Sequence, residues 1–119
     1  MNLVELFLTL QNQLRIYHWQ TKSFAEHNAF GDTYSELDGL IDEFMEIYIG
    51  KNERPVAKDK FNISLMNLAD NKVNVIDAFI DVLSQDLRQA LDERDTDLLN
   101  IRDEMTGLLN KLKYLLTLN

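Results

Sequence analysis

Two histidines, His18 and His27, and two carboxylates, Asp42 and Glu46, have the types and spacing to bind a metal ion. They are the only two histidines among the 119 residues. Imidazole nitrogens and carboxylate oxygens together suit iron, zinc or manganese. Asp42 and Glu46 share one helix face, and at about 100° per residue His27 lies roughly 60° from Asp42 around the same helix. One stripe of that helix could therefore carry three ligands, with His18 on the helix before it.

Each of these residues also has an ordinary structural interpretation. A lone histidine near a helix end usually caps or packs that end. Carboxylates at i and i+4 are common on solvated helix faces, where their repulsion costs only a few tenths of a kcal/mol. Asp38 lies nearer the centre of the same stripe than Asp42 and is a further candidate ligand. What favours a metal site is the grouping, because both histidines fall near the junction of the first two predicted helices and the carboxylates follow on the second.

The composition predicts a single all-α domain over residues 1–119. Only four glycines and one proline interrupt the apolar residues, so long helices are favoured over a turn-rich β fold. The net charge of −8 disfavours binding to nucleic-acid phosphates, and the lack of cysteine excludes disulfides and thiolate ligands. The N-terminus resembles no signal peptide, and no apolar run approaches the roughly 20 residues that span a membrane. A cytoplasmic, soluble protein is expected.

Apolar residues at helical spacing predict four helices, from about residue 2 to about residue 21, from Ser23 to Gly50, over 73–91 and over 98–115. Ser23 is the expected N-cap, in a capping box with Glu26, and Gly50 the expected C′ glycine. Residues 51–63 hold the only proline and show no period, which predicts a long connection. Residues 63–68 are expected to form a short helical turn. Short, long and short connections fit a four-helix bundle with one longer crossover between helices 2 and 3.

The first two predicted helices resemble the first two helices of the Dps-type mini-ferritins. The resemblance rests on His18-Trp19 and its neighbours, on His27, and on the segment from Asp42 to Glu46 that is followed by Gly50. The compact His-Trp-Gln-Thr-Lys-Ser sequence is also similar to small ferritin-like proteins of phages and large viruses. The resemblance implies a ferritin-like fold and an iron oxidation site shared between two subunits. In that site His18 and His27 come from one chain, and Asp42 and Glu46 from its partner.

The chain departs from that family at four places. Gly31 stands where the family has a further aspartate, and the segment between the two histidines is shorter. The connection after Gly50 is too short to hold the family's middle helix comfortably, and the lysine-rich tail that binds DNA is absent. An iron site inside one bundle would need a Glu-x-x-His pair from each of two helices, and with two histidines in all this kind of site is excluded. Trp19, Tyr17 and Tyr34 could neighbour an iron site, but packing in the core is the expectation for all three.

Two functions remain open. The first is a compact ferritin-like protein, a dimer at least, that binds iron or a similar divalent metal between subunits and oxidises Fe(II) with oxygen or peroxide. The second is a non-enzymatic helical bundle that acts as a protein-interaction or self-assembly module. Neither DNA nor a membrane is an expected partner.

Overall fold

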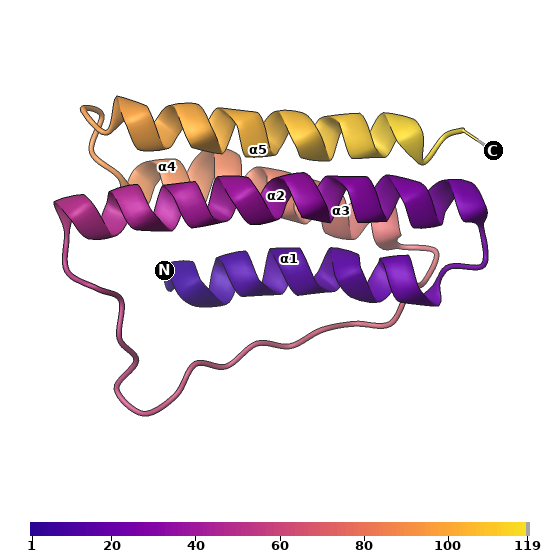
Figure 1. Ribbon diagram of the computed structural model, residues 1–119, viewed down its shortest axis with the longest axis horizontal. Helices are drawn as coiled ribbons and strands as arrows, with labels where there is room; N and C mark the ends of the chain where they lie inside the picture. Colours follow the sequence, from indigo (N-terminus) through magenta and orange to yellow (C-terminus); the bar gives the residue numbers. More distant parts are fainter. Residues whose placement is uncertain (119) are drawn as a thin grey trace.

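Four long helical segments run side by side in the computed structural model, which describes residues 1–118 and contains no strand in that range (Figure 1). They are α1 (Leu3–Gln20), α2 (Phe24–Lys51), a third segment made of α3 (Lys72–Asp81), a π-helical turn (Val82–Asp86) and α4 (Leu87–Ala90), and finally α5 (Thr96–Leu115). A long connection returns the chain from the end of α2 to the other end of the bundle, so α3 runs parallel to α2. The predicted all-α arrangement of four helices is confirmed.

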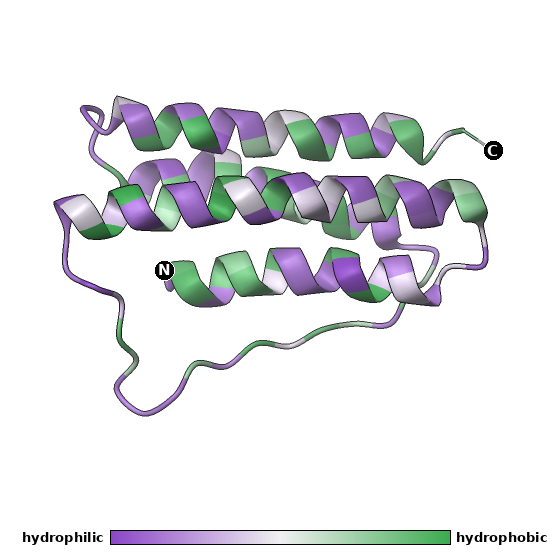
Figure 2. Ribbon diagram, viewed as in Figure 1, coloured by the Kyte–Doolittle hydropathy of each residue, from purple (hydrophilic) through white to green (hydrophobic). Residues whose placement is uncertain are grey.

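The core lies between the four helical segments. α1 packs on α2, α2 on α5, and α5 on α3 and the π-helical turn. Apolar residues alternate with polar ones along every helix (Figure 2), as expected when each helix buries one stripe. The rings of Phe7 and Phe44 meet edge to face with their centroids 5.0 Å apart, which ties α1 to α2. Fully buried side chains from all four segments complete the core: Leu10, Leu14, Tyr17, Phe30, Leu37, Ile76, Leu83, Leu87, Leu98, Met105, Leu109 and Leu112.

The ends of α2 agree with the sequence at one terminus only. Ser23 is the N-cap, and its hydroxyl accepts a hydrogen bond from the Glu26 N–H at 3.2 Å, as predicted. The prediction that Gly50 ends the helix is wrong, because α2 continues to Lys51 and no glycine has a positive φ. The helix ends where Asn52 becomes extended, and its N–H still bonds to a carbonyl of the last turn.

The long connection holds an extended segment, residues 61–68, which we call the strap. Side chains of α1 bind its backbone N–H groups: Glu5 binds Asn62 at 2.7 Å, Gln13 binds Met66 at 2.8 Å and Gln20 binds Leu68 at 2.7 Å. Gln13 is buried, and its amide also donates to the Met66 carbonyl at 2.8 Å. The predicted helical turn at 63–68 is therefore wrong. In a helical turn these backbone groups would form hydrogen bonds with one another, and the buried Gln13 amide would be left without a partner.

A buried arginine accompanies the π-helical turn. Arg102 extends from α5 and donates from Nη1 to the carbonyls of Leu83 and Ser84, at 3.3 and 3.2 Å. Such wider turns place carbonyls outside the ordinary helical ladder, where a neighbouring side chain can reach them. The sequence pattern predicts an uninterrupted helix over 73–91, and the structure adds this turn to it. No helix within residues 1–118 combines the length and apolarity that crossing a membrane requires.

Candidate metal centre

The two histidines meet at the hairpin between α1 and α2. His18 lies in the last turn of α1 and His27 in the first turn of α2. Residues 21–23 join the two helices in a tight turn, which folds the end of α1 against the beginning of α2 (Figure 1). The short sequence between the two histidines thus brings them together within one chain.

The two imidazole rings are stacked and hydrogen-bonded to each other's backbone. Their centroids lie 3.7 Å apart and their planes differ by 16°. His18 Nδ1 lies 2.6 Å from the His27 carbonyl oxygen, and His27 Nδ1 lies 2.9 Å from the His18 carbonyl oxygen. A carbonyl can only accept a hydrogen bond, so each Nδ1 carries a proton. In each ring Nε2 is therefore the nitrogen that can offer a lone pair, and a carbonyl behind the ring is the usual support of a metal-binding histidine.

Gly31 makes room for the His18 ring on the surface of α2. A Cβ atom at this position would lie 2.7 Å from His18 Cε1 and 2.9 Å from His18 Nδ1, closer than real contacts allow. Gly31, at the position where the resemblance to the mini-ferritins leads us to expect an aspartate, is thus the residue that lets this ring lie against the helix. The sequence alone does not show that Gly31 leaves room for a histidine ring.

Beyond His18, a row of polar and aromatic contacts follows the boundary between α1 and α2. The Tyr34 ring meets His18 edge to face with centroids 5.4 Å apart, and the Arg15 guanidinium lies 4.6 Å from the Tyr34 ring centre. Arg15 also pairs with Asp38 at 3.2 Å, and Gln11 donates to the other oxygen of that carboxylate at 2.8 Å. Asp38, a predicted ligand, is therefore engaged by two side chains of α1. Spacing alone could not show this, because it depends on the register of the two helices.

Asp42 and Glu46 lie far from the histidines of their own chain. Both are exposed on α2. At 1.5 Å per residue, Asp42 is about 22 Å along the helix from His27, and Asp38 is about 16 Å from it. Within residues 1–118, no three side chains of histidine, aspartate or glutamate are close enough together to hold a metal ion. Within one chain the two imidazoles therefore form a pair at the hairpin, and Asp42 and Glu46 lie at a separate place farther along α2.

An ion pair fixes the hairpin that carries the histidines. Glu26 binds Lys72 at 2.8 Å and accepts a hydrogen bond from the Thr21 hydroxyl at 2.8 Å. Burial alone would raise the pKa of Glu26, but the hydrogen bonds from Lys72 and Thr21 outweigh it and hold that pKa below its ordinary value. These contacts occupy the Glu26 carboxylate. It therefore does not accept a hydrogen bond from the Ser23 N–H, which is the second bond of the predicted capping box.

Two aromatic side chains are exposed beside the histidines. Trp19 is 66% exposed and Phe24 is 78% exposed, at either side of the hairpin turn. The expectation that Trp19 packs in the core is wrong, whereas Tyr17 is fully buried as expected and Tyr34 is partly buried. An exposed tryptophan next to the imidazole pair leaves an apolar surface at this end of the bundle.

Residues 18–116 match a family of unknown function, DUF5856. The chain belongs to this family. The matched range begins at His18 and includes every candidate ligand, together with Gly31. The DUF5856 match extends to α5, so it covers most of the bundle and not the hairpin alone.

Two curated proteins are similar to this DUF5856 chain. An uncharacterized 14.6 kDa protein from the mobD–ri intergenic region of enterobacteria phage T4 is 30% identical over 113 residues, which cover 95% of this chain and 84% of the phage protein. General stress protein 20U of Bacillus subtilis is 29% identical over 107 residues, which cover 80% of this chain and 70% of the bacterial protein. No solved structure is significantly similar to this chain.

Proposed function

We propose that this protein is a compact ferritin-like protein that binds iron, or a similar divalent metal, between two subunits and oxidises Fe(II). In this proposal His18 and His27 of one chain and Asp42 and Glu46 of a second chain form the site. The observation that carries the proposal is the stacked imidazole pair, in which both Nδ1 atoms bind carbonyls and both Nε2 atoms remain available. The arrangement of four helices with a long connection between the second and the third supports the ferritin-like fold.

Two imidazoles alone make an incomplete site for iron. Iron sites in proteins add carboxylates to histidines, and the carboxylates also offset the charge of the ion. Asp38 is occupied by Arg15 and Gln11, and about 22 Å separates Asp42 from His27 along α2. A second copy of the chain can bring its own Asp42 and Glu46 to the hairpin, since both carboxylates are exposed and form no ion pair within residues 1–118.

The chain's own groups then have separate roles. The carbonyls of His18 and His27 keep each Nδ1 protonated, so that Nε2 faces the ion. Gly31 leaves the space that the His18 ring occupies against α2. The carboxylates stabilise the higher charge that develops when Fe(II), the substrate, gives up an electron to oxygen or peroxide. The similarity to a general stress protein is in keeping with such a role.

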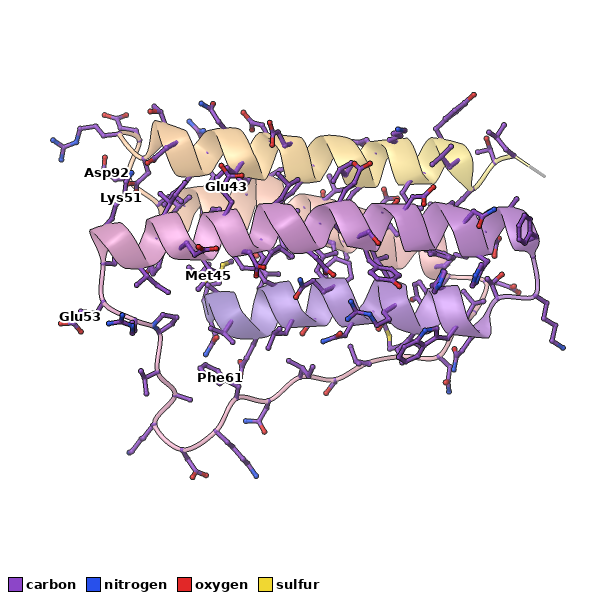
Figure 3. All side chains as sticks on the ribbon, viewed as in Figure 1. Glu43, Met45, Lys51, Glu53, Phe61 and Asp92 are labelled. Carbon is purple, nitrogen blue, oxygen red and sulfur yellow. The ribbon has the colours of Figure 1, made fainter. Side chains whose placement is uncertain are left out.

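The proposal is tested by oxygen uptake after Fe(II) is added to the metal-free protein. We expect uptake well above that of buffer in the wild type, and none above buffer in Asp42→Ala. The matched control is Glu43→Ala, which removes the neighbouring exposed carboxylate of α2. Glu43 lies on the side of the helix that faces α5 (Figure 3) and lines a groove there with Gly107. Uptake no faster than buffer in the wild type, or equal uptake in Asp42→Ala, would contradict the oxidation proposal.

The second candidate is a non-enzymatic bundle that acts through a protein partner or by self-assembly. It is favoured by the absence of a complete ligand set within residues 1–118 and by the exposed Trp19 and Phe24 at the hairpin. Metal-dependent stability separates the two candidates. A site that binds the folded protein must raise the unfolding temperature as divalent metal is added, whereas an interaction module of this kind should not respond.

A further inference from the structure

The strap presents an unpaired strand edge on the outside of the molecule. In an extended chain the N–H and C=O of one residue point to the same side, and successive residues alternate between the two sides. The N–H groups of Asn62, Met66 and Leu68 all bind side chains of α1. The even-numbered backbone groups therefore face the helix and the odd-numbered ones face away from it.

The outward-facing backbone groups have no partner within residues 1–118. No hydrogen bond joins the N–H or C=O of Ile63 or Leu65 to another part of this range. In Figure 1 the strap runs along the outer side of α1, with no other helix beyond it. Unpaired backbone groups in this arrangement are a template for a further strand.

The side chains of the strap also suit pairing with a strand. Phe61, Ile63 and Leu65 alternate along the segment, and each is 39% exposed. Figure 3 shows Phe61 at the beginning of the strap, beside the start of α1. Residues 61–69 contain neither a charged residue nor a proline, the two features by which proteins ordinarily block an exposed strand edge.

We propose that this edge is an interface with a second copy of the chain, in which two straps pair as antiparallel strands about a two-fold axis at Ser64. Pairing centred at Ser64 places Ile63 of each copy opposite Leu65 of the other copy. The two symmetry-related apolar pairs then lie on one face of the ribbon. It also gives Phe61 and Asn67 partners at the ends of the ribbon. The order across the dimer is α1, strap, strap, α1.

The sequence of the strap favours the second copy as the occupant, because the register about Ser64 pairs Ile63 with Leu65 in both directions, and charge does not oppose the contact at this segment. The chain carries a net charge of −8, so two copies repel each other over most of their surfaces. The strap is an uncharged stretch where two copies meet without placing like charges opposite each other. The contact uses none of the four proposed metal ligands, so it forms without metal and is independent of the proposed function.

A disulfide between two copies tests the register directly, because the chain has no cysteine of its own. At the centre of such a ribbon the two Ser64 residues form a pair without backbone hydrogen bonds, with Cα atoms about 4.5 Å apart, within the range that a disulfide spans. With diamide as oxidant, the rate of covalent dimer formation should be about tenfold higher or more in Ser64→Cys than in the control Val56→Cys. Val56 is 84% exposed and lies outside the strap.

Sedimentation equilibrium of the metal-free protein provides the second measurement. We expect a dimer whose dissociation constant rises at least about tenfold in Ile63→Lys, because the two-fold axis places the new charge in the interface twice. Val56→Lys, with the same charge change, should leave dimerisation unchanged. Circular dichroism establishes that each variant is folded. A monomeric wild type, equal cross-linking at positions 64 and 56, or a dimer unaffected by Ile63→Lys would overturn the proposal.

Discussion

Replacing Gly31 with alanine should destabilise the protein, although the same change in the middle of a helix is ordinarily stabilising. Alanine is preferred over glycine in helices by about 0.5–1 kcal/mol. At position 31, however, the new Cβ would lie 2.7 Å from His18 Cε1, and ordinary contact begins at 3.4 Å. The ring must therefore retreat by about 0.7 Å, away from the helix on which it lies.

The retreat disrupts contacts that hold His18. Its hydrogen bond to the His27 carbonyl, now 2.6 Å, would lengthen to as much as about 3.3 Å and weaken, at a net loss of up to about 1 kcal/mol. The stacking on His27 and the edge contact with Tyr34 would also weaken. These losses exceed the gain in helix propensity, and we expect Gly31→Ala to lower the free energy of unfolding by about 0.5–1 kcal/mol.

Two other glycines provide matched controls in the same molecule. Gly39 in α2 and Gly107 in α5 are both exposed helical positions, and a Cβ at either would meet nothing within 4 Å. Gly39→Ala and Gly107→Ala should each raise the free energy of unfolding by about 0.5–1 kcal/mol. Chemical denaturation of the three variants gives the comparison. If Gly31→Ala is as stabilising as the controls, the His18 ring is not held against α2 and the reasoning is refuted.

Three further predictions concern residues outside the imidazole pair. Arg102→Met should lower the free energy of unfolding, measured by urea denaturation, by about 1–3 kcal/mol, because two backbone carbonyls lose the Arg102 donor. Its control, Arg94→Met, should change the free energy of unfolding little, because the Arg94 side chain is 89% exposed. Tyr17→Phe should raise thermal stability, since the buried Tyr17 hydroxyl has no hydrogen-bond partner within residues 1–118; an unchanged or lower unfolding temperature would contradict this. The pKa of Glu26 is lowered in the folded state. Its contribution to the stability of the fold is therefore present above the pKa of the unfolded chain and is lost as the pH falls through the pKa of the folded state. Glu26→Gln should thus be destabilising at pH 7, and denaturation below pH 4 should show a smaller difference from wild type; a constant difference would argue against the ion pair with Lys72.

The helices could be predicted from sequence because each buries one apolar stripe at a regular spacing. The sequence also predicts the Ser23 cap, since a serine hydroxyl before a helix satisfies a free N–H. The extended strap could not be predicted in this way. Its apolar residues occur at intervals that suit a helical turn, and what holds it extended is Gln13, more than fifty positions away in the sequence. The π-helical turn likewise depends on Arg102 from another helix.

The candidate site was predictable in its residue types but not in its arrangement. The spacing of His27, Asp42 and Glu46 shows which helix face they share, and it does not show that the His27 ring turns back to stack on His18. The engagement of Asp38 by Arg15 depends on how α1 lies against α2. Side-chain pairing across two helices is fixed by packing, which the periodicity of one helix does not determine.

The central claim is that one metal site is built by two chains, and mixing two inactive variants tests it most directly. One variant carries His18→Ala and His27→Ala, and the other carries Asp42→Ala and Glu46→Ala. Each alone should bind no Fe(II) in an anaerobic calorimetric titration.

After subunit exchange, half of the dimers are mixed and each has one intact site, so the mixture should regain about a quarter of the wild-type capacity. A mixture that binds no Fe(II), although native mass spectrometry shows mixed dimers, would contradict a site shared between chains. Undiminished binding by either variant alone would show that the residues it lacks are not ligands.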